Sequence, residues 1–201
     1  MALAAGALRF GDFTLKSGRR SPYFFNAGVF SDGAGLKALS GFYRAALDEA
    51  GLAFDMLFGP AYKGIVLAAA LAIDYAAGGR NVPFAYDRKE DKDHGEGGRL
   101  VGAPLGGRVL IVDDVLSAGT SARAAVRTIE AAGAVAAGLV VALDRQERGL
   151  ENGAAGEFEA AGIPVVSVVT LDDLAAYLEP AAGGAVEKAA LLEYRRRWRC
   201  N

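Results

Sequence analysis

Short apolar runs alternate with stretches of helical period through the middle of this chain, and this alternation limits its fold more than any other feature. The apolar runs, which predict strands, occupy residues 54–58, 82–86, 108–112, 135–143 and 164–169. The spacing predicts helices over residues 36–50, 63–75 and 122–132, and Gly51 and Gly133 are well placed to end the first and the last. Strands and helices that alternate in this way build βαβ units around a parallel sheet. We therefore expect an α/β fold with a central, mainly parallel sheet flanked by helices.

The two ends of the chain depart from this alternation. The N-terminal segment is rich in Phe, Gly and basic side chains, so we expect a small hood over approximately residues 1–35. A core over approximately residues 36–178 and a helical tail over approximately residues 179–201 would complete one domain, for which 201 residues are an ordinary size. Near the end of the core, Thr170 and Asp173 have the spacing of a helix N-cap.

The composition argues against several classes of protein. Lys and Arg number 22 against 24 Asp and Glu, a net charge of −2, so we expect no nucleic-acid partner, whose binding usually needs a strong basic excess. One cysteine, Cys200, and one histidine, His94, exclude an internal disulfide and a His/Cys zinc cluster. The longest apolar run, residues 65–73, is far shorter than the ~20 residues of a membrane-spanning helix. We therefore expect a cytoplasmic protein without a membrane partner.

The segment RVLIVDDVLSAGTSAR, residues 108–123, carries the clearest chemical signal. We expect its apolar strand to end at two adjacent carboxylates, Asp113 and Asp114, from which a loop of small residues, 117–121, leads into a helix. Ligands of parallel sheets bind beyond the carboxyl ends of the strands. Small residues let backbone N–H groups close around a phosphate, and the helix N-terminus favours the same anion. Because the acids can accept hydrogen bonds from a sugar diol, the segment predicts a site for a ribose 5-phosphate.

Other interpretations fit this segment less well than a ribose 5-phosphate site. It has neither the GxxxxGK[ST] pattern of nucleotide triphosphatases nor the GxGxxG pattern of dinucleotide-binding folds. A strand that ends in Asp-Asp is also typical of a phosphorelay receiver domain. A strand that begins near residue 108 leaves too little chain for such a domain of ~100 to 150 residues. A tight turn whose acids cap the next helix is an alternative that needs no ligand.

Five motifs distributed along the chain point to one enzyme family. They are FTLKSGRRSPYFFNAG (13–28), LFGPAYKG (57–64), RKEDKDHGEGG (88–98), VDDVLSAGTSAR (112–123) and LDRQERG (143–149). With these motifs the chain resembles the type I phosphoribosyltransferases, and among them the orotate-specific members. The resemblance extends from Phe10 to about Leu178. The strand with its acid pair identifies only the superfamily, whereas the first and third motifs single out orotate.

The resemblance implies a reaction, a metal ion and an assembly. Similar enzymes transfer ribose 5-phosphate from 5-phosphoribosyl 1-pyrophosphate (PRPP) to N1 of orotate, and form orotidine 5′-monophosphate and pyrophosphate in de novo pyrimidine biosynthesis. They use Mg²⁺, which is held mainly by the substrates, with a water-mediated contact expected at Asp113 or Asp114. They are homodimers in which a lid, residues 88–99 in this chain, serves the site of the neighbouring subunit.

The resemblance also assigns roles to individual residues. It implies PRPP binding by Lys16, Tyr62, Lys63, Arg88, Lys89, Lys92, His94, Asp113, Asp114, Val115, Leu116, Ser117, Ala118, Gly119, Thr120 and Ser121. It implies orotate binding by Phe24, Phe25, Ser117 and Arg145. The catalytic residues that it implies are Lys92, His94, Asp113 and Asp114. Similar enzymes often have Thr in place of Ser117, and a cis peptide that does not precede proline in the loop that matches residues 60–64.

Each assignment has a simpler structural alternative. Four basic residues offset four acidic ones in the lid, a composition that also fits a solvated surface loop. Lys63 could extend into solvent, and the two phenylalanines could pack in a core. Arg145 could pair with Glu147 or Asp144. At the level of function, the alternatives are a phosphoribosyltransferase for a purine or uracil and a non-catalytic regulator that senses PRPP on the same fold.

Overall fold

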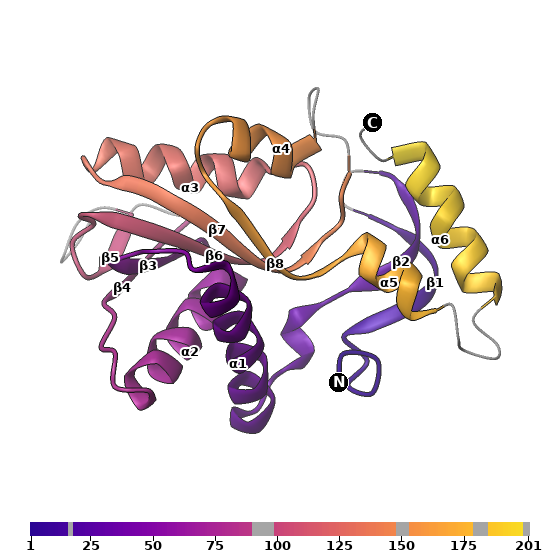
Figure 1. Ribbon diagram of the computed structural model, residues 1–201, viewed down its shortest axis with the longest axis horizontal. Helices are drawn as coiled ribbons and strands as arrows, with labels where there is room; N and C mark the ends of the chain where they lie inside the picture. The colour runs from indigo at the N-terminus through magenta and orange to yellow at the C-terminus, as the bar shows by residue number, and fades with distance from the viewer. Residues whose placement is uncertain (16–17, 90–98, 148–152, 179–184, 199–201) are drawn as a thin grey trace.

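The structure is a computed structural model of the 201-residue chain (Figure 1). It describes residues 1–15, 18–89, 99–147, 153–178 and 185–198. None of the helices in these ranges is long and apolar enough to cross a membrane.

A six-stranded sheet with the order β5-β4-β3-β6-β7-β8 forms the centre of the molecule (Figure 1). Its strands are β3 (Met56–Gly59), β4 (Phe84–Asp87), β5 (Leu100–Gly102), β6 (Arg108–Leu116), β7 (Val135–Asp144) and β8 (Val165–Thr170). The strands run parallel except β5, which pairs antiparallel with β4 at one edge. The mainly parallel sheet expected from the alternating pattern is therefore confirmed.

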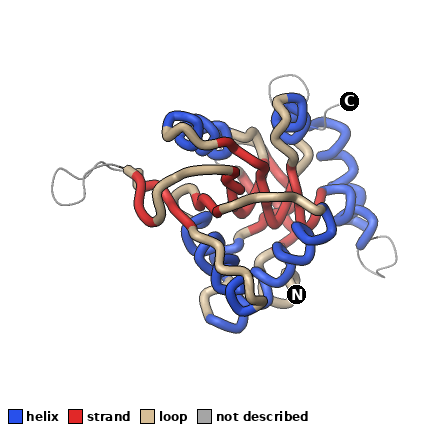
Figure 2. Tube along the Cα trace, turned by 60° about the vertical axis from the view of Figure 1, so that its left-hand side comes forward, coloured by secondary structure: helices blue, strands red, loops and turns tan. Residues whose placement is uncertain are grey.

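Helices cover both faces of this sheet (Figures 1 and 2). They are α1 (Gly33–Ala50), α2 (Lys63–Ala77), α3 (Thr120–Ala131) and α4 (Gly153–Ala160). Leu110 and Val112 of β6 pack with α1 and α2, whereas Val109 and Ile111 pack with α3 and α4, because successive strand residues point to opposite faces. All four side chains are fully buried. A strand that is buried on both faces has a continuous apolar sequence. The apolar run from which β6 was predicted is such a sequence.

The hood lies beside one end of the sheet, against the C-terminal helices (Figure 1). Its strands β1 (Leu8–Thr14) and β2 (Arg20–Phe25) pair antiparallel, and a short 3-10 helix (Ala27–Val29) follows them. The C-terminal helices are α5 (Leu171–Tyr177) and α6 (Ala185–Trp198). Tyr23 of β2 packs in one apolar cluster with Leu174 of α5 and Leu191 of α6. The hood and α6, which are far apart in the sequence, are therefore packed together.

Strand β6 extends farther than the sequence predicted. The prediction ended it at Val112, but the strand continues to Leu116, so that Asp113 and Asp114 lie inside it. Asp113 pairs in register with Val141, and Leu116 with Asp144. The prediction was wrong here because β7 supplies backbone partners beyond the acids, and this pairing outweighs their polarity. The acids are thus held by the sheet, not by a tight turn.

Two glycines let the start of α2 approach the sheet closely. A Cβ atom on Gly59, the last residue of β3, would overlap the carbonyl group of Gly64. A Cβ atom on Gly64 would lie 2.6 Å from the carbonyl oxygen of Val112 and 2.7 Å from Cδ of Pro60. No larger residue fits at either position without movement of the backbone. This close approach sets Lys63, the first residue of α2, beside the end of β6.

Candidate active site

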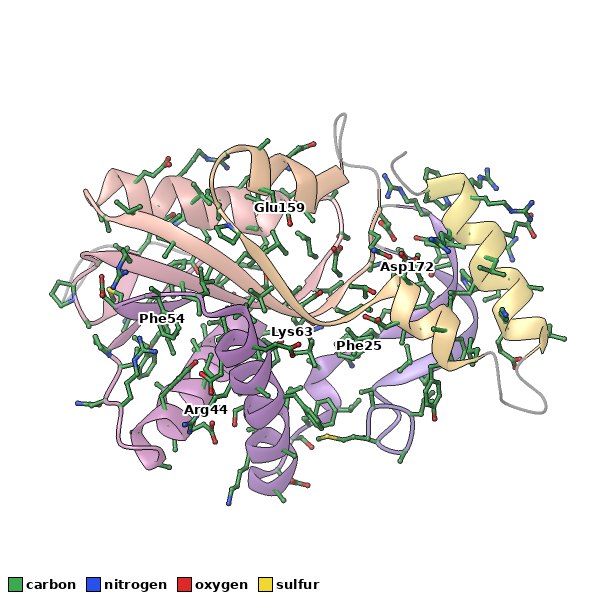
Figure 3. The ribbon with its side chains drawn as sticks, viewed as in Figure 1. Phe25, Arg44, Phe54, Lys63, Glu159 and Asp172 are labelled. Carbon is green, nitrogen blue, oxygen red and sulfur yellow. The ribbon has the colours of Figure 1, made fainter. Side chains whose placement is uncertain are left out.

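The carboxyl ends of β3, β6 and β7 meet at one edge of the sheet and bring several of the predicted site residues together. Lys63 of α2 lies on the side of the core that faces the hood, from which Phe25 extends toward the core (Figure 3). The Lys63 Nζ atom lies 2.5 Å from Asp114 Oδ2, although the two residues are 51 positions apart. The Lys63 side chain is 46% exposed and that of Asp114 is 13% exposed. The structure thus joins Lys63 to the acid pair, with part of the lysine still open to a ligand.

Asp113 is the more perturbed of the two acids. Burial raises the pKa of its carboxyl from 3.8 to about 6, and the charge of Asp114 acts in the same direction. Hydrogen bonds from the Asp114 backbone N–H, at 2.9 Å, and from the Ser121 hydroxyl oppose this rise in pKa. The hydroxyl of Tyr43 donates to the Asp113 carbonyl oxygen at 2.8 Å and fixes the backbone. Burial raises the pKa of Tyr43 well above its ordinary value, so this donor stays protonated.

The loop after β6 leads to the N-terminus of α3. Gly119 occupies the N-cap position with a φ of 75°, and no side chain in the described parts of the chain caps the helix. A small cavity of about 110 Å³ lies here, and its lining includes Asp113, Ser117, Thr120 and Ser121. The first N–H groups of a helix have no partner within the helix. The loop therefore offers donors to an anion beside the acid pair, as the ribose 5-phosphate hypothesis requires.

The loop between β3 and α2 contains the unusual peptide that the resemblance implied. The bond between Ala61 and Tyr62 is cis. The Ala61 backbone N–H donates to Asp87 Oδ1 at 2.7 Å, which ties this loop to the end of β4. Tyr62 is 62% exposed, and Lys89 Nζ lies 4.6 Å from the centroid of its ring. Tyr62 and Lys89 therefore lie together near Lys63, as a shared role in binding PRPP would require.

The structure describes only the two ends of the lid, and the hood lysine lies outside the described residues. The backbone N–H of Arg88 donates to the Arg99 carbonyl oxygen at 2.8 Å, so the two described ends of the lid are paired. Lys16, Lys92 and His94 lie outside the described residues. Their assigned roles stay predictions.

The hood phenylalanines make packing contacts. The Phe24 ring lies 5.6 Å from that of Phe13, between ring centroids, and Arg9 lies over it at 5.7 Å. Phe25 packs against the apolar clusters of the core and of the C-terminal helices. It also lines an apolar cavity of about 350 Å³ with Leu143. These are the contacts that the packing alternative describes, and contact with a pyrimidine stays a prediction.

Arg145 lies at the same edge of the sheet, inside a buried ion pair. Its backbone N–H donates to the Leu116 carbonyl oxygen at 3.0 Å, which places it next to the start of the Ser117 loop. Its Nε atom lies 2.6 Å from Glu147 Oε1. Of the two partners considered from the sequence, Glu147 forms the pair, whereas Asp144 accepts a hydrogen bond from the Gln146 backbone.

Sequence reasoning missed several residues that shape the site. Tyr43 and Asp87 hold the backbone near the acids, and Ser21 and Tyr194 bond to Arg145. Glu147 was named only as a competitor for Arg145, although it lies in the LDRQERG motif. The other contacts join distant segments, and no local pattern signals them.

Two comparisons with known proteins identify the family. The family model for the phosphoribosyl transferase domain matches residues 32–155. An orotate phosphoribosyltransferase of Thiobacillus denitrificans is 58% identical over 196 residues, which cover 96% of this chain and 92% of the relative. The chain belongs to the orotate phosphoribosyltransferase family. The predicted reaction, transfer of ribose 5-phosphate from PRPP to orotate in pyrimidine biosynthesis, is confirmed, and a purine or uracil acceptor is not supported.

Further orotate phosphoribosyltransferases agree with this result. One from Neisseria meningitidis serogroup C is 61% identical over 175 residues, which cover 86% of this chain and 82% of the relative. The crystal structure of the orotate phosphoribosyltransferase of Francisella tularensis superimposes with a TM-score of 0.85 at 36% identity, over 98% of this chain and 96% of that one. The predicted α/β fold class, with a mainly parallel sheet flanked by helices, is therefore confirmed as that of an orotate phosphoribosyltransferase.

Replacement of Asp113 by Asn should stabilise the chain in a pH-dependent way. The carboxyl pKa is about 6 in the folded chain and 3.8 ordinarily, so ionisation above about pH 6 lowers the free energy of unfolding, and this loss is absent below about pH 4. We expect the Asp113→Asn chain to gain about 1–2 kcal/mol more over the parent at pH 7.5 than at pH 4. Urea unfolding at both pH values measures the gain, and a gain that is equal at both would contradict the raised pKa.

Proposed function

We propose that PRPP binds along the acid pair and the loop of residues 117–121, with orotate toward Arg145 and the hood. The proposal is carried by the 2.5 Å ion pair between Lys63 and Asp114, which lies beside a helix N-terminus that no described side chain caps. The lysine suits the pyrophosphate of PRPP, the two acids suit its ribose diol, and the open backbone N–H groups suit its 5-phosphate. These groups belong to one edge of the sheet, as a single extended substrate requires.

The acid pair also suits a Mg²⁺ ion that is bound together with the substrate. Among the residues that the structure describes, no group of three His, Cys, Asp or Glu side chains gathers into a metal site. Mg²⁺ commonly keeps several waters and binds one or two carboxylates plus substrate phosphates. Asp113 and Asp114 both fit that arrangement, and we propose one or the other as the water-mediated protein contact. When bound, the ion would neutralise charge on the pyrophosphate.

The residues of the chain would act on PRPP at three points. Backbone N–H groups of residues 117–121 would bind the 5-phosphate, and Asp113 and Asp114 would accept hydrogen bonds from the ribose hydroxyls. An ammonium group has three N–H bonds, so Lys63 can keep its contact with Asp114 and still donate to pyrophosphate. The proposed pyrophosphate contacts also include Tyr62, Arg88, Lys89 and, outside the described residues, Lys16, Lys92 and His94.

The reaction would proceed by displacement at C1 of the ribose without a covalent enzyme intermediate. The bond from C1 to the pyrophosphate oxygen breaks and its electron pair leaves with pyrophosphate, while N1 of the orotate anion supplies the pair for the new bond. Positive charge grows on the ribose ring between these events, and Asp113 and Asp114 stabilise it. We propose that Lys92 or His94 donates a proton to the pyrophosphate oxygen as it leaves, and that Phe24, Phe25, Ser117 and Arg145 hold the orotate.

An absorbance assay tests the proposed substrates and metal. Purified chain with PRPP and Mg²⁺ should consume orotate, with uracil and adenine unchanged as control acceptors. Excess chelator should abolish the reaction, and added Mg²⁺ should restore it, because the basic side chains alone would not neutralise the charge of the leaving pyrophosphate. Orotate consumption that continues in excess chelator would contradict the proposed metal, and no consumption with Mg²⁺ present would contradict the substrates.

We further propose that the enzyme is a cytoplasmic homodimer whose lid serves the neighbouring site. Val66 and Ile73 support pairing, since they lie seven residues apart on one face of α2 and are 49% and 71% exposed. We propose that a second copy of the chain packs against this apolar face. The single cysteine is consistent with a reducing compartment, because it leaves no internal disulfide.

Hybrid dimers test the shared lid. At an orotate concentration near the KM of the parent, Lys92→Ala and Arg145→Ala chains should each show only residual activity alone, and a random mixture should recover about a quarter of the parent activity. Half of the dimers are then hybrids with one intact site of two. Each chain refolded with itself is the control. Hybrids that stay inactive would contradict the shared lid, because each subunit would then supply its own.

A further inference from the structure

Arg145 is held in a buried cluster that draws on three distant parts of the chain. Ser21 comes from β2 of the hood, Arg145 and Glu147 follow β7, and Tyr194 lies on α6. Each of these four residues is 5% exposed or less. Figure 1 shows α6 alongside the strands of the hood, so the cluster lies where these elements meet the end of the sheet.

The hydrogen bonds in this cluster fix the plane of the Arg145 guanidinium. Its Nε atom donates to Glu147 Oε1 at 2.6 Å, and its Nη2 atom donates to Ser21 Oγ and to the Tyr194 hydroxyl, both at 2.9 Å. The Tyr194 hydroxyl in turn donates to Glu147 Oε1. Arg145 Cζ also lies 4.2 Å from the centroid of the Tyr23 ring. A planar group with three oxygen partners and a ring against it has little freedom to rotate.

These bonds use three of the five N–H groups of the guanidinium. A guanidinium has one N–H at Nε and two each at Nη1 and Nη2. Among the described residues, Nη1 has no hydrogen-bond partner, so both of its N–H groups are left for a ligand. The backbone bond from Arg145 to Leu116 sets the Arg145 backbone beside the start of the Ser117 loop.

Glu147 is the shared partner of two arginine side chains in this cluster. Its carboxylate is shared by two arginines, with Arg145 on Oε1 and with Arg19 of the hood on Oε2 at 2.8 Å. Two cations on one anion leave the side chains bonded to this carboxylate with one positive charge in excess. Asp144, whose charge also acts on Glu147, accepts its hydrogen bond from the Gln146 backbone and not from either arginine. An anionic carboxylate from a substrate would balance that excess charge, whereas a neutral pyrimidine would not.

We propose that Tyr194 and Glu147 are positioning residues for orotate recognition, and that α6 thereby takes part in the choice of substrate. Their hydroxyl and carboxylate would hold the Arg145 guanidinium in one orientation and leave Nη1 free for the ligand. This inference rests on the proposed function, in which Arg145 binds the orotate carboxylate. It adds to that function a requirement for a C-terminal helix that contains none of the motif residues.

The Tyr194→Phe variant tests this role with little change in packing. The ring would keep its contact with Tyr23, at 5.9 Å between centroids, and only the hydroxyl between Arg145 and Glu147 would be lost. Because one hydrogen bond to a charged group is removed, we expect the KM for orotate to rise about tenfold. The KM for PRPP should change less than about twofold, since Tyr194 does not contact the acid pair or the loop.

Two further variants separate positioning from a purely structural role. Tyr177→Phe removes a hydroxyl from α5, where the side chain is 63% exposed, and should leave both KM values unchanged. In an Arg145→Ala background, Tyr194→Phe should cause no further rise in the KM for orotate, because the residue through which it acts is gone. Circular dichroism of each variant confirms that the chain is folded.

The outcomes distinguish this inference from the function on which it rests. If Arg145→Ala raises the KM for orotate and Tyr194→Phe does not, the positioning role is wrong and the proposed function stands. If the effects of the two substitutions add, or if Tyr194→Phe raises both KM values equally, Tyr194 does not act through Arg145. If neither variant changes the KM for orotate, the role of Arg145 in the proposed function is itself wrong.

Discussion

The ion pair between Lys63 and Asp114 is the interaction on which the arrangement of the site depends. It joins the start of α2 to the end of β6, and it requires the close approach that Gly64 permits. Parallel strands place their carboxyl ends at one edge, so the pairing of β6 with β7 brings the loop after β6 and the residue after β7 to the same edge as this contact. Without it the acids would share a buried edge with no compensating cation, and burial already raises the pKa of Asp113.

Most of the core could be predicted because its signals are local. Continuous apolar runs marked the buried strands, and the capping box at Thr170 and Asp173 formed as its spacing indicated. The predicted end of β6 was wrong because the partners of its last residues lie on β7, which is distant in the sequence. Strand β5 was missed because it has three residues and depends on pairing with β4. Helix α4 was missed because glycines and alanines give it little periodicity.

The same difference between local signals and distant contacts applies to the residues of the site. The acid pair, Lys63 and the Ser117 loop belong to short motifs whose chemistry can be recognised from neighbouring residues, and the structure brings them to one edge. The partners of Arg145 could not be predicted, because Ser21 is 124 positions away and Tyr194 is 49 positions away. Such contacts depend on how the hood and α6 pack on the core. The proposed recognition of orotate thus draws on α6, which lies outside the motifs.

The turnover of an Asp114→Asn chain with orotate, PRPP and Mg²⁺ tests the central claim most directly. Asparagine has nearly the same shape as aspartate, so the fold should be retained, and circular dichroism can verify this. It carries no charge to hold Lys63 or to face the cationic ribose. We predict that turnover falls by roughly a hundredfold or more. Turnover within about twofold of the parent would contradict the assignment of the acid pair to catalysis.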